Sequence, residues 1–295
     1  MNAARFGPAG NAGSFPGKSS LEAPAWLRGL GLSAYEYQCG RGVNIGEETA
    51  RKLGAQAREH DIALSLHSPY YINLASGDPD RRAKNVGHIM KSARAASAMG
   101  AARIVVHSGA AGGGTDRRQA AATALDTLRE ALSRMEEAGF GGITLCPETM
   151  GKINQLGTLE EVLTLCQGDA RLLPCVDFGH LYARSHGAFN TPEAFAAALD
   201  AMEIALGWDR MRSFHVHFSK IQFSRGGEMR HLTLDNPEYG PDFALLAPLL
   251  RERGCTPVFI CESAGVQAED AMTMRKIWEN TPMKHEDDNE IITHD

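Results

Sequence analysis

Histidine and acidic side chains recur in this sequence where short β-type runs end. The set comprises His67, His107, Glu148, Asp177, His180, His215, His217, Glu228, His231 and Glu262. Mixed imidazole and carboxylate ligands with few thiolates suit zinc, with Mn²⁺ or Fe²⁺ as lesser options. A single ion takes about four to six ligands, so a set of this size predicts two or three ions.

Any one of these residues alone is more often an ordinary polar side chain at a loop junction than a ligand. The prediction therefore depends on their coincidence at one place in the fold. Several carboxylates brought that close would repel one another unless cations lay between them.

The elements that must position these residues alternate along the chain. Predicted strands are Arg5–Gly7, Ala34–Gln38, Ala63–His67, Arg103–His107, Ile143–Glu148, Leu173–Asp177, Ser213–His217 and Val258–Glu262. Helical patterns between them cover Gly46–His60, Arg81–Met99, Asp116–Ala138, Thr158–Cys166, Thr191–Leu206, Pro241–Arg253 and Ala268–Glu279. Eight strands alternating with helices predict an α/β protein, a (β/α)₈ TIM barrel.

In such a barrel the carboxyl ends of the strands converge on one mouth, where active sites form. The metal-capable residues follow consecutive predicted strands at that end, so we expect a metal site there. Residues 1–284 are predicted to form this single domain, and residues 285–295 an acidic polar tail.

Composition excludes several classes of protein. With 43% hydrophobic and 22% charged residues in 295, the chain can fold around a core and is not of disordered type. No run is long and apolar enough to span a membrane, and no secretory signal is evident at the start. A cytoplasmic monomer with reduced core cysteines is therefore expected. Most of the net charge of −6 lies in the acidic tail, so it does not exclude a DNA substrate.

The ordered motifs resemble the endonuclease IV family of apurinic/apyrimidinic endonucleases over residues 3 to about 270. They are Leu66-His67-Ser68-Pro69-Tyr70, Val106-His107-Ser108-Gly109, Pro147-Glu148-Thr149, Val176-Asp177-Phe178-Gly179-His180, His215-Val216-His217-Phe218-Ser219-Lys220, Arg230-His231 and Cys261-Glu262-Ser263. The resemblance implies a barrel with a trinuclear zinc cluster that hydrolyses the phosphodiester 5′ to an abasic site in damaged double-stranded DNA.

The resemblance also implies roles for residues. His67, His107 and Glu148 would hold the first zinc, and Glu148 would bridge to a second. Asp177, His215 and Glu262 would hold that second ion, with Glu148 and Glu262 as the catalytic carboxylates. His180 and His231 would hold the third ion with one more carboxylate.

Two positions depart from the family pattern. The family commonly has Asp-Arg-His at the third zinc, whereas this chain reads Glu228-Met229-Arg230-His231. Met229 has no oxygen to offer, so Glu228 would have to reach the ion by way of one extra residue. His217 stands where the family usually has Asn, as an additional ligand or a phosphate contact.

Contacts with DNA are expected from residues around the mouth. Tyr70 resembles an aromatic side chain that the family inserts at the lesion, and Arg41 is predicted to wedge the duplex. Lys220 and Arg230, together with Arg225, would contact backbone phosphates. Closely spaced zinc ions would lower the pKa of a bridging water towards ~7, which supplies a hydroxide nucleophile.

Two other functions remain open. A sugar isomerase or epimerase on the same barrel would need only one divalent ion, held by Glu148, Asp177, His215 and Glu262. A metal- or ligand-binding barrel without catalysis would need a blocked mouth or lost ligands. Against the isomerase stand His67, His107, His180 and His231, which a single-metal site does not require.

Overall fold

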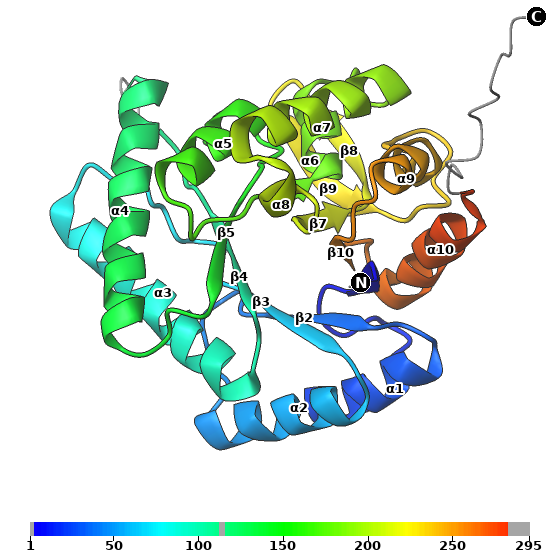
Figure 1. Cartoon of the computed structure of the whole chain (residues 1–295), viewed down its shortest axis with the longest axis horizontal. Helices are drawn as coiled ribbons and strands as arrows, with labels where there is room; N and C mark the ends of the chain where they lie inside the picture. The colour runs from blue at the N-terminus through cyan, green and yellow to red at the C-terminus, as the bar shows by residue number, and fades with distance from the viewer. Residues whose placement is uncertain (1–2, 112–115, 283–295) are drawn as a thin grey trace, which may run out of the picture.

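The structure is a computed structural model that describes residues 3–111 and 116–282, so the predicted tail at 285–295 lies outside the described residues. Eight parallel strands form a nearly closed barrel with helices around it, which confirms the predicted (β/α)₈ fold (Figure 1). The strands are β1 (Arg5–Pro8), β2 (Ala34–Gln38), β3 (Ala63–His67), β4 (Arg103–His107), β5 (Thr144–Glu148), β6 (Cys175–Asp177), β7 (His215–Phe218) and β10 (Val258–Cys261).

The strands are ordered β1-β10-β7-β6-β5-β4-β3-β2 in the sheet. A bridge between Ala9 and Glu36 and a hydrogen bond from Ser33 N to Phe6 O (2.9 Å) bring β1 beside β2. Because all strands run in one direction, the ends of β3 to β7 and of β10 meet at one rim.

Helices cover the outside of the barrel. They are α1 (Ala23–Gly29), α2 (Glu47–Glu59), α3 (Pro79–Met99), α4 (Arg117–Glu137), α5 (Leu159–Gly168), α6 (Phe178–Arg184), α7 (Pro192–Leu206), α8 (Trp208–Met211), α9 (Phe243–Glu252) and α10 (Gln267–Asn280), preceded by the short 3₁₀ helix η1 (Ser20–Glu22). Thr158 and Glu161 form the predicted capping box at the start of α5. Gly100, with φ 71°, ends α3 in the left-handed conformation that glycine adopts without strain.

The segment after β7, to which the sequence assigns neither a helix nor a strand, has regular structure. It forms an antiparallel hairpin of β8 (Lys220–Ser224) and β9 (Gly227–Leu232). Gly227, with φ 89°, supplies the turn that the two strands require. The hairpin carries Glu228 and His231, so these two side chains lie on a strand with a defined register.

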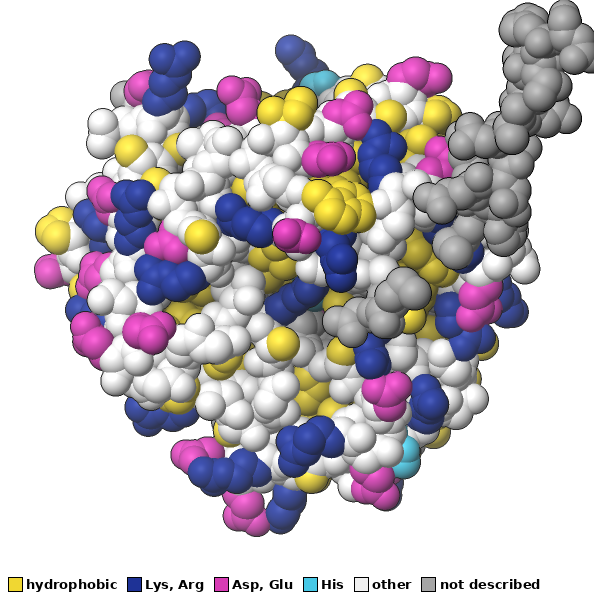
Figure 2. Space-filling view, in the orientation of Figure 1, with side chains coloured by type: hydrophobic (Ala, Val, Ile, Leu, Met, Phe, Trp, Pro, Cys, Tyr) yellow, Lys and Arg dark blue, Asp and Glu magenta, His cyan; other side chains and the backbone are white. Residues whose placement is uncertain are grey.

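The hydrophobic core lies between the barrel and its helices. Phe6 stacks on Phe259 with ring centroids 4.6 Å apart, and Phe243 meets both rings edge-on. All six cysteines are buried and unpaired. No helix of the described residues is long and apolar enough to cross a membrane. On the face shown in Figure 2, Lys and Arg are interspersed with Asp and Glu.

Candidate metal centre

Most of the residues predicted to bind metal line a cavity of about 300 Å³ at the carboxyl ends of the barrel strands. Its lining includes His67 at the end of β3, His107 at the end of β4, Glu148 at the end of β5 and Glu262 directly after β10. His180 joins them from the first turn of α6. The cavity is open to solvent, and of its polar lining residues His67, Glu148 and His180 are buried.

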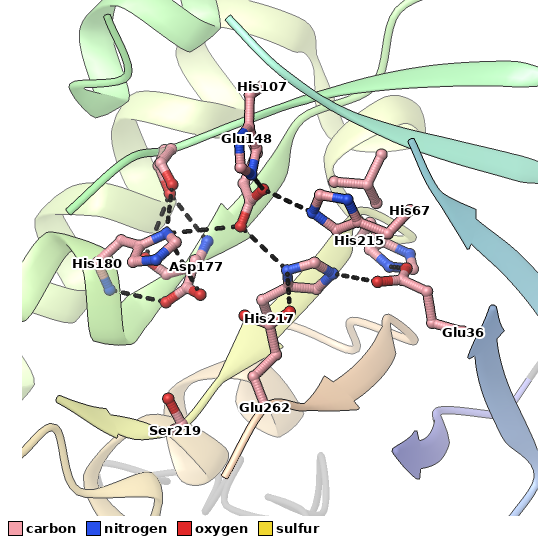
Figure 3. Close-up of polar contacts among 12 residues, drawn as sticks. Glu36, His67, His107, Glu148, Asp177, His180, His215, His217, Ser219 and Glu262 are labelled. Atoms are coloured by element: carbon pink, nitrogen blue, oxygen red, sulfur yellow. Dashed lines mark hydrogen bonds and ion pairs between the residues drawn. The ribbon is translucent and has the colours of Figure 1, made fainter. Parts of the chain in front are cut away.

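Glu148 is the centre of the arrangement (Figure 3). Its Oε2 lies 3.2 Å from Nε2 of His67 and 3.2 Å from Nε2 of His107. Its Oε1 lies 3.1 Å from Nδ1 of His217. The two oxygens of this carboxylate therefore face different nitrogen donors.

A second group shares Glu148 with Asp177, His217 and Glu262. The ligand atoms of these four residues all lie within 4.8 Å of one another, and all but Glu262 are buried. His217 is paired with Asp177 in the register of β7 and β6. Nitrogen and oxygen donors at this spacing suit a zinc, manganese or iron ion.

A third group comprises His180, Glu228 and His231. Nε2 of His180 lies 3.4 Å from Oε2 of Glu228, and Nε2 of His231 lies 3.9 Å from Oε1 of Glu228. Glu262 connects this group to the second, with Oε2 3.9 Å from Nδ1 of His231.

A β-bulge at Met229 explains how Glu228 reaches this group. Gln222 pairs with Arg230, but the next residue of β8, Phe223, pairs with Glu228, so Met229 is left without a partner. An extra residue of this kind turns the strand locally and re-aims its side chains. Glu228 and His231, three residues apart, therefore face the same site. Met229 itself points outward and is 57% exposed.

Each histidine of the centre has its outward ring nitrogen held by another group. Nδ1 of His67 lies 2.8 Å from Ser68 O, Nδ1 of His107 lies 3.1 Å from Tyr70 O, and Nδ1 of His180 lies 2.8 Å from Thr149 O. Nδ1 of His231 lies 2.8 Å from Ser219 Oγ. Such contacts fix the ring of a metal-ligating histidine and leave its other nitrogen free for the metal.

Asp177 provides a direct test of whether the donor set fits a cation. Its Oδ1 accepts a hydrogen bond from His180 N (2.7 Å) and so caps α6. Its Oδ2 is buried, lies 3.4 Å from Nδ1 of His180 and makes no hydrogen bond with any described residue. A buried carboxylate oxygen without a donor is costly, and a cation among Glu148, Asp177, His217 and Glu262 would satisfy it.

In this structure His215 does not lie with Asp177 and Glu262, with which it was predicted to hold the second ion, and its ligand atom instead groups with those of Cys175 and His217. His215 and His217 lie on the same face of β7, but His215 is one residue pair deeper in the barrel. Its Nε2 lies 2.9 Å from Oε2 of Glu36, and it lines a cavity with Arg5, Ser213 and Thr256, residues beside the amino ends of the strands. His217 occupies the position that was assigned to His215.

Sequence reasoning did not identify Glu36. This residue lies in the middle of β2, is 0% exposed, and has Oε1 3.0 Å from Nε2 of His217. Burial alone would raise the pKa of Glu36, but His217 and His215 lower it well below the usual value. The only signal in the sequence is a charged residue inside the apolar stretch Ala34-Tyr35-Glu36-Tyr37.

The protein without metal balances its buried carboxylates with protonated imidazoles. Burial alone would lower the pKa of His67, but the hydrogen bond and charge of Glu148 raise it to about 9. Burial likewise opposes the charge of His180, yet Asp177, Glu228 and Glu148 raise its pKa to about 9. For Glu262, burial is the largest effect and raises the pKa.

The residues predicted to contact DNA lie around the mouth and differ in their exposure and hydrogen bonds. Tyr70 lines the cavity and is 56% exposed. Arg41 is exposed in the turn after β2, and Arg230 is exposed with Nε 2.7 Å from Gln222 Oε1. Lys220 donates from Nζ to Asn236 O, so its ammonium is tied to a loop. Lys152, which sequence reasoning did not select, is exposed and lines the cavity.

The sequence of this chain is similar to one family of proteins and to several known proteins. A family model described as a xylose isomerase-like TIM barrel matches residues 24–279. An uncharacterized protein of Methanocaldococcus jannaschii is 32% identical over 84% of this chain and 88% of its own length. A probable endonuclease 4 of Natronomonas pharaonis is 30% identical over 60% of this chain and 62% of its own length.

Solved structures show the same fold with two different chemistries. Endonuclease IV from Thermus thermophilus superimposes with a TM-score of 0.62 at 22% identity, covering 89% of this chain and 96% of that one. D-Psicose 3-epimerase from Clostridium cellulolyticum gives a TM-score of 0.61 at 15% identity, covering 89% and 91%. At these identities the likeness shows the fold alone.

Proposed function

This chain belongs to the xylose isomerase-like TIM barrel family, and on that premise we propose that it is a metal-dependent phosphodiesterase of DNA repair. In this proposal it cleaves the DNA backbone 5′ to abasic sites, with two or three zinc ions in the cavity at the barrel mouth. The relatives described as probable endonuclease 4, at about 30% identity, support this choice of reaction.

The observation that carries the proposal is the double engagement of Glu148. Its two oxygens face two different sets of nitrogen donors, His67 with His107 on one side and His217 on the other. A carboxylate placed in this way can bridge two neighbouring cations. The separate group of His180, Glu228 and His231 supports a third position.

Zinc ions held there would supply Lewis acidity, polarising a phosphodiester and stabilising the charge that develops as it breaks. The chain's own residues would bind the metal ions and orient the substrate. The imidazoles are held in fixed orientation through Ser68, Tyr70 and Thr149. In this proposal Tyr70, which is exposed at the rim, would occupy the gap that a missing base leaves in a duplex. Extrusion of a base-less sugar meets little resistance, which provides selectivity without reading bases.

The phosphate contacts of this proposal come from exposed cations around the mouth. Arg41, Arg230 and Lys152 are exposed there. Lys220 would first have to release Asn236 O, so we assign it a smaller part.

The test couples metal analysis of the purified protein to incision of a duplex with one abasic site. We expect two or three zinc ions per chain and a single nick 5′ to the lesion. Glu148→Gln should lose bound metal and incision, whereas Glu160→Gln, on the exposed side of α5, should lose neither. One ion per chain without incision would overturn the proposal.

A single-metal sugar epimerase is the second candidate, because Glu148, Asp177, His217 and Glu262 form a complete site for one ion. Incubation with a panel of ketohexoses and separation of the epimers tests it. Epimer formation by a protein with one ion per chain would favour this function. His67, His107, His180 and His231 would then have no role in the reaction.

A further inference from the structure

Glu36 lies inside the barrel, one layer below the metal centre, and no step of the proposed reaction uses it. It comes from the middle of β2 and is 0% exposed. Its Oε1 lies 3.0 Å from Nε2 of His217, and its Oε2 lies 2.9 Å from Nε2 of His215. A buried carboxylate is costly unless other groups satisfy it, so its place here needs an explanation.

The imidazole of His217 lies between Glu36 on one side and two further carboxylates on the other. Nε2 faces Glu36, while Nδ1 lies 3.1 Å from Oε1 of Glu148 and 3.5 Å from Oε1 of Glu262 (Figure 3). A neutral imidazole has one N–H and one lone pair, and the group opposite one nitrogen decides which nitrogen carries the proton. Without metal, Nδ1 makes a hydrogen bond with Glu148, and Nε2 meets Glu36 in an ion-pair contact. Once Glu148 and Glu262 bind cations, Glu36 is the carboxylate that remains to hold a proton of this ring, on Nε2, which leaves the Nδ1 lone pair for the metal.

We propose that Glu36 is a positioning residue that makes His217 an Nδ1 ligand of the metal centre. It fixes both the tautomer and the ring orientation, in the way that carboxylates behind metal-ligating histidines do. The proposal also gives a role to His215, which does not lie with Asp177 and Glu262: it holds the far oxygen of Glu36.

Glu36 is itself held in place from both sides. Ser65 Oγ donates to its Oε2 (2.8 Å), and Gln38 Nε2 donates to its Oε1 (3.1 Å). With His215 on Oε2 as well, the carboxylate has little freedom to turn away from His217. The row from His215 through Glu36 to His217 therefore connects the buried layer of the barrel to the cluster at the mouth.

This inference rests on the metal centre of the proposed function but not on its substrate. An epimerase with one ion at Glu148, Asp177, His217 and Glu262 would need the same orientation of His217. The experiments below measure zinc binding without DNA, so their failure and a failure of the incision assay are distinguishable.

The first experiment uses the unaltered protein loaded with zinc and ¹⁵N-labelled at histidine. Long-range ¹H–¹⁵N correlation spectra report which ring nitrogen carries the proton, and His217→Asn assigns the signals. We expect the proton of His217 on Nε2 and the metal on Nδ1. A proton on Nδ1 would overturn the proposal, and this result needs no variant at Glu36 to fold.

The second experiment measures zinc affinity by competition with a chelator. Glu36→Gln should weaken the binding of one ion about 10-fold, and Glu36→Ala about 100-fold, while the affinity of the remaining zinc is unchanged. Glu161→Gln is the matched control, because this half-buried carboxylate pairs with Arg117 outside the centre. It should lower the melting temperature without changing zinc affinity. Unchanged affinity in Glu36→Gln, or an equal loss in Glu161→Gln, would contradict the proposal.

Discussion

Glu228 and His231 lie three residues apart on β9, yet both face His180, with Oε1 of Glu228 3.9 Å from Nε2 of His231. In a regular strand, residues three apart point to opposite faces. The bulge at Met229 removes that conflict. The extra residue relative to the Asp-Arg-His pattern is therefore accommodated by the backbone and does not by itself remove the third group of ligands.

Insertion of an alanine between Gln222 and Phe223 tests this relationship. It would give Met229 a partner on β8 and remove the bulge, so Glu228 should turn to the outer face of the hairpin, and bound zinc should fall by one ion per chain. Met229→Ala keeps the backbone and should retain all the metal, because this side chain is 57% exposed. Metal analysis after removal of loosely bound zinc measures both. Equal metal content in the two variants would show that the bulge does not position Glu228.

Gly151 provides a second test from the opposite side of the same group. A Cβ there would lie 2.6 Å from Cβ of Glu228 and 2.9 Å from Cδ2 of His180. Gly151→Ala should therefore displace both side chains and lower incision by about 10- to 100-fold. Gly142→Ala is the control, since a Cβ at that position meets nothing within 4 Å. Comparable incision by the two variants would contradict the expected clash.

Substitutions at His217 and His215 test which of the two histidines binds the metal. His217→Asn should lose an ion per chain and reduce incision by more than about 100-fold. His215→Asn should retain the metal count, with a smaller loss of affinity through Glu36. Zinc content and incision rates check both. Loss of an ion in His215→Asn alone would restore the assignment made from the sequence.

Stability of the metal-free protein should fall as the pH rises from about 6.5 to 9. The pKa values of His67 and His180 are raised to about 9, so their ion pairs stabilise the fold fully below the ordinary value of 6.5 and disappear as the pH passes the raised value. Zinc displaces these protons, so its affinity should increase over the same range. Melting temperatures with chelator and with excess zinc measure the contrast. A metal-free protein equally stable at pH 6.5 and 9 would be inconsistent with these ion pairs.

Tyr70 should affect the recognition of damaged DNA and not the binding of metal. Tyr70→Ala removes a ring that is 56% exposed beside the cavity, and incision efficiency should fall about tenfold through KM, at unchanged zinc content. Ile204→Ala is the control, because Ile204 is an apolar side chain on α7 that is 87% exposed and does not line the cavity. Steady-state incision kinetics on an abasic duplex distinguish the two. An equal effect of both substitutions would argue against a specific role for Tyr70.

The amino-acid sequence by itself determined the fold and most of the cluster. Alternation of apolar strands with capped helices predicts the barrel, and parallel strands bring His67, His107 and Glu148 to one rim whatever the details of the loops. Asp177 and His180 follow the same logic, because an aspartate that ends a strand also caps the next helix.

Only the tertiary structure decided between His215 and His217. Residues two apart on a strand share a face and differ only in depth, by about 7 Å, so periodicity cannot rank them. The register of β7 against β6, which pairs His217 with Asp177, is set by contacts distant in the sequence. The same reason applies to Glu36 and to the bulge at Met229. Each depends on which residue a neighbouring strand places opposite it, and that information appears only when the barrel has closed.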